Sequence, residues 1–324
     1  MIAIVLIAIA AGCASALMFA SMVSGALISV LLLYLAPLPL MVAALGWGPL
    51  CATIGGIAAA TGLGAIFGLP YCIAFVVAVA LPAWWLGHLA LLGRPVANSE
   101  TSPGNGATAT PPPLEWYPVG RILLWIAGFA VLTTMSVLLT LGHDAATVTS
   151  VIRHGLSLVW GRDEAINEET QRGIDMLAAI APAAAAIVAM MTLTLNLWLA
   201  AKITATSGRL HRPWPDLNNT ALPPMTLAAL SVAIAFCFIG GLSAMLSQII
   251  GSALTMAYAL AGFAVLHTLT LALRHRALWL SCTYTVVAVF GWPVLAIAAL
   301  GLADAVFGLR QRYLQSRPPP LPAA

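Results

Sequence analysis

Charged side chains are scarce in this 324-residue chain, and their scarcity decides its class. Only 7% of the residues are Asp, Glu, Lys or Arg, whereas 61% are hydrophobic. Because soluble domains carry about a quarter charged residues, a water-soluble globule of this size would lack the polar surface that it needs. We therefore predict an all-α, polytopic transmembrane helical bundle. Since a membrane helix takes about 20 apolar residues, the sequence has room for roughly eight to ten spans.

A basic excess and a metal-binding cysteine pattern are also missing. The net charge is +3, and it is spread along the chain, which predicts no nucleic-acid partner. The five cysteines all lie in apolar segments and none has CxxC spacing, so we predict no metal site and no cofactor. No Lys or Arg precedes Arg94. The N-terminus therefore lacks the basic start of a secretory signal, and we expect residues 1–20 to form the first span.

Glycine and proline divide the apolar sequence into segments. Breaks at residues 21–25, 46–49 and 68–70 predict four spans in the N-terminal part. The predicted parts are an N-terminal four-span bundle (1–92), a flexible cytoplasmic linker rich in Pro, Gly, Ser and Thr (93–118), a C-terminal membrane bundle (119–309) with an external interfacial helix (145–172), and a Pro-rich cytoplasmic tail (310–324). The apolar stripe of the external helix fits either a packed connector or a lid.

The distribution of basic residues predicts the topology. Ten of the 13 Lys and Arg residues fall in alternate loops and in the C-terminal tail, so the positive-inside rule places both termini in the cytoplasm. The segment 277–309 would be about 50 Å long as one helix, and Trp292-Pro293 offers a break. We expect this segment to cross the membrane twice, giving ten crossings. The alternative is eight crossings, with either the final hairpin or a segment within residues 1–45 re-entrant.

Polar side chains within the spans are the candidates for a ligand site, because burying them in lipid is costly. They are Asn196, His267 and Asp304. For His267, a hydrogen-bonded core histidine is the favoured interpretation over a ligand contact. Ser243 lies in a GxSx sequence, but a turn near 248–251 would place it roughly 16 Å from His267 in depth, which excludes a serine–histidine dyad. No other catalytic motif is present, so we expect no enzyme.

Two further features are candidates for partner docking. Small residues recur at every fourth position of the first span, including Gly12, Ala16 and Ala20. Such strips permit close helix contact, either within the chain or with another membrane subunit. The loop at 207–217 combines Arg209, Arg212 and Trp214. These side chains fit contact with anionic lipid or recruitment of a cytoplasmic partner.

Several short motifs together resemble the YybS-like family of bacterial integral membrane proteins. They are the sequences at 35–40 (LAPLPL), 46–49 (GWGP), 301–304 (GLAD) leading to Arg310, and the stretch from Asn196 to Asp216. The N-terminal half is similar to the substrate-binding subunits of energy-coupling-factor transporters. The resemblance implies a bacterial inner-membrane protein without enzymatic activity that binds a small molecule and docks another membrane subunit or an ATPase module. The alternative is a structural or assembly factor that recruits its partner through the 207–217 loop.

Overall fold

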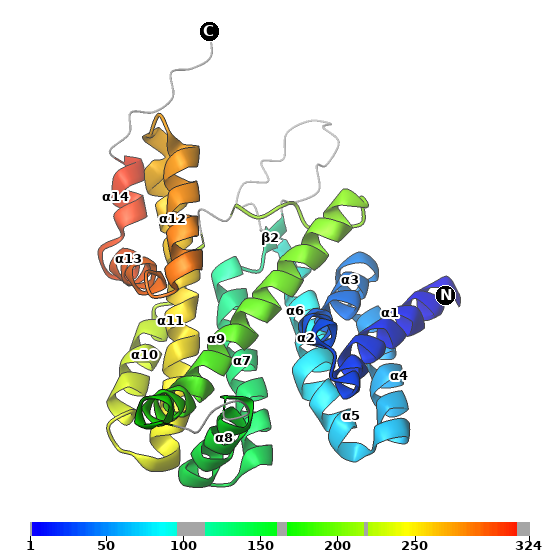
Figure 1. Ribbon diagram of the computed structural model, residues 1–324. Helices are drawn as coiled ribbons and strands as arrows, with labels where there is room; N and C mark the ends of the chain where they lie inside the picture. The colour runs from blue at the N-terminus through cyan, green and yellow to red at the C-terminus, as the bar shows by residue number, and fades with distance from the viewer. Residues whose placement is uncertain (1, 96–113, 161–166, 217–219, 316–324) are drawn as a thin grey trace. The chain divides into compact units, whose positions relative to one another are not determined.

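The computed structural model describes residues 2–95, 114–160, 167–216 and 220–315 (Figure 1). Among these residues, seven helices are long and apolar enough to cross a membrane, and a bent pair, α13 with α14, is an eighth candidate. The all-α membrane architecture is confirmed. The chain divides into two compact units: unit 1 is Met1–Ile122 with Leu195–Pro215, and unit 2 is Leu123–Thr194 with Asp216–Ala324. Residues 195–215 thus belong with the N-terminal bundle, which the sequence did not reveal.

The four predicted N-terminal spans are all present in unit 1. Their elements are α1 (Ile2–Ala20) with η1 (Ser21–Ser24), α2 (Leu27–Leu35) with α3 (Pro37–Trp47), α4 (Pro49–Phe67), and α5 (Leu69–Phe75) with a π-helical turn η2 (Val76–Ala80) and α6 (Leu81–Ala90). Gly48 and Gly68 have φ angles of 95° and 92°, a backbone conformation that favours glycine. Each is followed by a helix with proline in its first turn, so the predicted breaks are confirmed.

The two ends of the predicted linker are paired strands. β1 (Gly93–Pro95) lies antiparallel to β2 (Leu114–Trp116), and the exposed Arg94 and Glu115 side chains form an ion pair of 2.7 Å across them. The prediction of an unstructured linker over 93–118 therefore fails at both ends, because the chain closes on itself there. Residues 96–113 lie outside the described residues.

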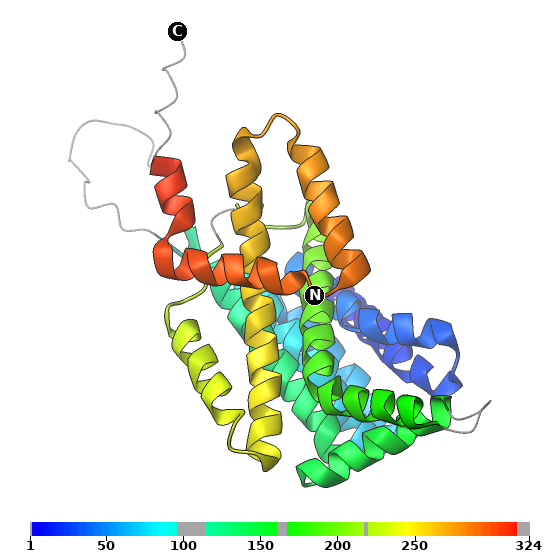
Figure 2. The same cartoon turned by 60° about the vertical axis from the view of Figure 1, so that its left-hand side comes forward.

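Unit 2 contains most of the remaining helices. They are α7 (Val119–Leu141) from residue 123, α8 (Ala145–Trp160), α9 (Glu168–Thr206) up to residue 194, α10 (Met225–Phe236), α11 (Gly241–Leu269), η4 (Thr270–Ala272), α12 (Arg276–Phe290), α13 (Val294–Phe307) and α14 (Leu309–Gln315). The helix predicted to be external over 145–172 is shorter: α8 ends at Trp160, and Glu168 already begins α9. Figure 2 shows a bend in the N-terminal part of α9. This helix contains Pro182, which lacks the N–H that a straight helix requires.

The turn before α11 is not where the sequence predicts it. It lies at 237–240, between α10 and α11, and not at 248–251. Gly240 and Gly241 both have positive φ angles, whereas Ser252 donates to the Ile249 carbonyl oxygen inside the helix. Ser243 and His267 therefore lie on one helix, 24 residues or about 36 Å apart. A dyad between them is excluded, for a different reason from the predicted one.

The final segment breaks where the sequence predicts but does not run as predicted. α12 ends at Phe290, Gly291 has a φ of 70°, and α13 begins at Val294. Figure 2 shows α13 running across α11, while α14 turns back toward the end of unit 2 that holds the α11–α12 turn. The bend between α13 and α14 is 68°. α12 and α13 therefore do not form the two-span hairpin that the sequence predicts, and their course favours the re-entrant alternative.

Candidate functional site

The crossing of α13 over α11 brings two backbones into direct contact. A Cβ atom at Gly262 would overlap the carbonyl oxygen of Ile297, and a Cβ atom at Gly301 would overlap that of Tyr258. Only glycine permits this approach at both positions. The crossing therefore fixes the middle of α13 against the stretch of α11 from Tyr258 to Gly262.

Two half-length helices flank this crossing. α10 lies along the N-terminal half of α11, since its Thr226 hydroxyl is 2.8 Å from the Tyr258 hydroxyl. α12 lies beside the C-terminal part, where Tyr284 stacks on Phe263 with ring centroids 4.9 Å apart. α10 and α12 have 12 and 15 residues, about 18 and 22 Å, and are shorter than the apolar core of a bilayer. Broken helices that meet within a bundle are typical of binding sites in transporters.

A buried ion pair joins α13 to α14. The Asp304 Oδ2 atom accepts hydrogen bonds from Arg310 Nε at 2.8 Å and from Nη2 at 2.7 Å, while Oδ1 accepts the Arg310 backbone N–H at 2.8 Å. The two side chains are 9% and 11% exposed. Gly308, with a φ of 62°, closes the last turn of α13 by donating to the Asp304 carbonyl oxygen at 2.8 Å. Asp304 therefore holds both sides of the bend.

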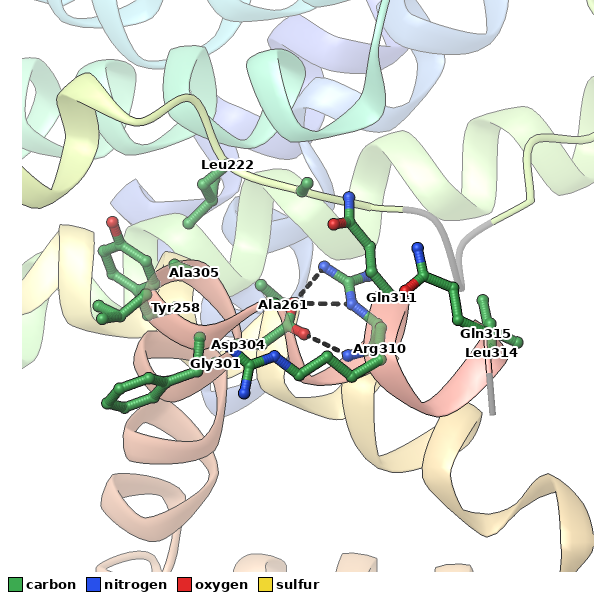
Figure 3. Close-up of a pocket in the computed structure, with 15 residues that line it drawn as sticks. Leu222, Tyr258, Ala261, Gly301, Asp304, Ala305, Arg310, Gln311, Leu314 and Gln315 are labelled. Carbon is green, nitrogen blue, oxygen red and sulfur yellow. Dashed lines mark hydrogen bonds and ion pairs between the residues drawn. The ribbon is translucent and has the colours of Figure 1, made fainter. Parts of the chain in front are cut away.

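An open pocket of about 640 Å³ surrounds this ion pair. We call it the α13–α14 pocket. Its lining residues are Ala221, Leu222, Tyr258, Ala261, Gly301, Asp304, Ala305, Val306, Phe307, Gly308, Arg310, Gln311, Arg312, Leu314 and Gln315. Figure 3 shows Asp304 and Arg310 facing each other, with Gln311 and Gln315 on the α14 side. One carboxylate and two guanidinium groups leave one excess positive charge, and this volume suits a small molecule.

The hydroxyl pair beneath the pocket has a defined direction. Thr226 Oγ1 donates its single proton to the Pro223 carbonyl oxygen at 2.6 Å. The Tyr258 hydroxyl must therefore be the donor in its 2.8 Å contact with Thr226. Tyr258 is 1% exposed, so this contact ties the start of α10 to α11 without adding charge.

A second, smaller groove of about 440 Å³ lies between α9, α10 and α11. Its polar side chains are Ser247, Gln248, Ser252 and Thr255. Ser252 and Thr255 donate to carbonyl oxygens of their own helix, at 2.9 and 2.7 Å. The groove holds no charged side chain among its lining residues, which makes it the weaker candidate for a ligand site.

The three predicted ligand residues occupy three different surroundings. Asp304 lines the α13–α14 pocket. His267 lies on the same helix as the pocket residue Tyr258 but contacts α12: its Nε2 atom is 2.8 Å from the Tyr284 hydroxyl, and its Nδ1 atom is 3.4 Å from Arg276 Nη2. Because Arg276 can only donate, Nδ1 accepts and Nε2 carries the proton.

Asn196 belongs to unit 1. Its Nδ2 atom donates to the Tyr34 carbonyl oxygen at 2.7 Å, and the residue is 1% exposed. Tyr34 lies in the last turn of α2, whose carbonyl groups have no partner within their own helix, and Pro37 begins the next helix. The Asn196 amide thus donates a hydrogen bond to a helix-end carbonyl group that would have no partner in lipid.

The predicted docking strip of α1 is partly covered within unit 1. A Cβ atom at Gly12 would overlap the carbonyl oxygen of Gly55 on α4, and Ala8 is fully buried. Ala16 and Ala20, farther along the helix, are half-buried. The first part of the strip therefore serves internal packing.

The loop at 207–215 is also tied to its own unit. Arg212 donates to the carbonyl oxygens of Ala90 at 3.2 Å and Tyr117 at 3.0 Å. Burial lowers the pKa of its guanidinium group, although this group keeps its charge at any physiological pH.

The two other candidates in this loop make cation–π contacts. Arg209 lies over the Trp47 ring at 4.6 Å, and Lys202 lies over the Trp214 ring at 4.0 Å. Both Arg209 and Trp214 remain exposed. Residue 217, the end of the predicted recruiting loop, lies outside the described residues.

Several pocket residues were not among the predicted candidates. Arg310 was noted as part of a motif but not as the partner of Asp304, because their six-residue separation fits no helical pair. Tyr258 and Gln315 have no sequence signal that sets them apart. Among the described residues, no group of three His, Cys, Asp or Glu side chains is arranged to hold a metal.

The comparisons with known proteins agree with the membrane architecture. A family of predicted membrane proteins, DUF2232, matches residues 13–305. No curated protein and no solved structure matches the chain. Because the match covers both units and all but the ends of the chain, this protein belongs to the DUF2232 family of predicted membrane proteins.

Proposed function

We propose that this protein is a non-enzymatic membrane subunit that binds a small molecule, or helps to move it, through the α13–α14 pocket. The observation that carries the proposal is the meeting of α10, α12 and α13 at one level of α11, beside an open pocket with a buried ion pair. Charged residues inside membrane bundles commonly mark ligand pathways. We place the protein in a bacterial inner membrane with both termini in the cytoplasm.

The accessibility of the pocket tests this function. In a variant without its five native cysteines, we would introduce Ala261→Cys or Ala257→Cys. Both alanines are on α11 and are buried, at 4% and 0% exposure, but only Ala261 lines the pocket. A charged, membrane-impermeant thiol reagent should label the cysteine at 261 from one face of membrane vesicles and leave that at 257 unreacted. Failure to label 261, or equal labelling of both, would contradict a water-accessible pocket.

The resemblance to transporter binding subunits that the sequence suggests adds a partner to the proposal. We propose that Ala16 and Ala20, the less covered part of the α1 strip, contact another membrane subunit of a complex with an ATPase module. Replacing Ala20 with Leu should then abolish co-purification of that subunit. The same substitution at Ala10, an exposed alanine of α1 outside the strip, is the matched control (Ala10→Leu). Purification of the intact protein without any such subunit would count against this role.

An assembly factor is the second candidate, and the exposed Arg209 and Trp214 support it. Arg212 is a poor probe of recruitment, since its loss would release the loop from Ala90 and Tyr117. The sharper variant replaces Arg209 and Trp214 by Ala and keeps Arg212. Loss of a cytoplasmic partner from pull-downs of this variant would favour the assembly role, and unchanged recovery would remove it.

A further inference from the structure

We propose that the α13–α14 pocket holds the phosphate-bearing headgroup of an anionic phospholipid, with Arg312 as its phosphate contact. The inference rests on the proposed binding function and names the class of ligand. It starts from the charges of the lining. Both oxygens of Asp304 already accept hydrogen bonds from Arg310, so this carboxylate is not available to a cation. The excess positive charge is that of Arg312, whose guanidinium has no carboxylate partner among the described residues.

Hydrogen-bond donors gather on the same helix as this charge. Gln311, Arg312 and Gln315 all lie on α14 and line the pocket. Residues three and four positions apart share a helix face, so Gln315 is a neighbour of both others. A guanidinium fork and two amide groups lining the same pocket supply donors that the acceptor oxygens of a phosphate ester need.

The rim of the pocket indicates an acyl chain. Val306, Phe307 and Leu314 are 57%, 58% and 47% exposed, and all three line the pocket. A free phosphate ion would occupy only a small part of about 640 Å³, since one water molecule takes about 30 Å³ of liquid. A headgroup with the first carbons of its chains accounts for both the volume and the apolar rim.

The position of the pocket fits the surface of an anionic leaflet. α14 lies on the end of unit 2 that also holds the α11–α12 turn (Figures 1 and 2). That turn carries Arg274 and Arg276, and α14 carries Arg310 and Arg312. Basic residues at one end of a membrane bundle attract anionic lipid. The pocket lies at this basic end and provides a specific binding site for one lipid.

Lipid retention measured by native mass spectrometry tests the proposal. The full chain would be reconstituted in nanodiscs of equal palmitoyl-oleoyl phosphatidylglycerol and phosphatidylcholine, then released in detergent. We expect one phosphatidylglycerol to remain bound to the wild type and retention to fall about fivefold in Arg312→Gln, since one basic residue near an anionic surface contributes about that factor. Arg274→Gln, an equal charge change outside the pocket, should retain the lipid, and Arg312→Lys should restore part of it.

The other outcomes overturn the proposal in distinct ways. Equal loss in Arg312→Gln and Arg274→Gln would show attraction by net charge without a site. If phosphatidylcholine were retained as well as phosphatidylglycerol, the negative charge of the headgroup would have no role in binding. Displacement of the lipid by millimolar glycerol 3-phosphate would assign the pocket to a free phosphate ester. If Ala261→Cys is still labelled in any of these cases, the lipid inference fails while the binding function stands.

Discussion

Breaking the Asp304–Arg310 pair should destabilise unit 2 by more than a surface ion pair could. We consider Asp304→Asn, which keeps an oxygen for the Arg310 backbone N–H but removes the charge. Two unit charges about 4 Å apart attract by about 4 kcal/mol at an effective dielectric constant of 20, and both side chains are about nine-tenths buried. Because the open pocket gives the remaining guanidinium some access to water, we expect the free energy of unfolding to fall by about 3 kcal/mol, at the lower end for buried pairs.

A double-mutant cycle separates this interaction from general damage. Arg310→Gln alone should cost about 3 kcal/mol, and the double variant about 4 kcal/mol, which leaves a coupling of about 2 kcal/mol between the two side chains. Reversible unfolding of the purified protein in mixed micelles, followed by circular dichroism, gives the four free energies. Additive single-variant effects, or a loss below 1 kcal/mol in Asp304→Asn, would contradict a strongly coupled buried pair, because the pair would then behave like an exposed one.

Three other predictions address packing, helix ends and pH. Gly301→Ala should lower the free energy of unfolding by about 1–3 kcal/mol, because the added methyl group would overlap α11. Gly128 faces open space, so Gly128→Ala should be neutral or slightly stabilising. Equal effects of the two substitutions would contradict the close crossing of α13 over α11. Asn196→Val should lower the free energy of unfolding by about 1–3 kcal/mol in the same assay, since it leaves the buried Tyr34 carbonyl oxygen without this hydrogen-bond donor. Hydrogen bonds from Thr147 lower the pKa of Asp144 below its usual 3.8. This cap on α8 should therefore persist above pH about 4 and be lost as the pH falls through the lowered pKa. Amide exchange at Thr147 that is independent of pH in this range, after correction for intrinsic rates, would contradict this prediction.

The sequence predicted the membrane class and most helix boundaries because local chemistry sets them. Apolar composition excludes a soluble fold, and Gly48-Pro49 ends one helix and starts the next through backbone geometry alone. The Trp292-Pro293 break is equally local, and the structure confirms it. Each of these features is decided within a few residues of chain, so a single sequence suffices to find it.

The candidate site depends on contacts between distant residues, which no local pattern encodes. Asp304 was a candidate because a carboxylate is rare in an apolar segment, but its pocket exists only because Gly262 and Gly301 allow α13 to lie across α11. Asn196 looked like a ligand residue for the same reason as Asp304. Its bond to Tyr34, 162 positions away in sequence, shows a structural contact instead. A polar residue in a span is therefore expected to be buried in hydrogen bonds, but its polarity does not show whether it binds a ligand or stabilises the fold.

The turn before α11 shows how composition misleads. Ser and Gly are frequent in turns, so a segment from Gln248 to Ser252 with a central glycine resembles one. Inside a helix, however, serine donates to a carbonyl oxygen of the preceding turn, as Ser252 does. The actual turn uses Gly240 and Gly241 with positive φ angles.

The α13–α14 pocket depends on the re-entrant course of α12, α13 and α14. Cysteines introduced singly at His275, Trp292 and Gln315 in a cysteine-free chain report on this course in sealed vesicles of known orientation. We predict that positions 275 and 315 react with an impermeant thiol reagent from the same face, and that position 292 does not react from the opposite face. Labelling of position 292 from the opposite face alone would establish two full crossings and contradict the account.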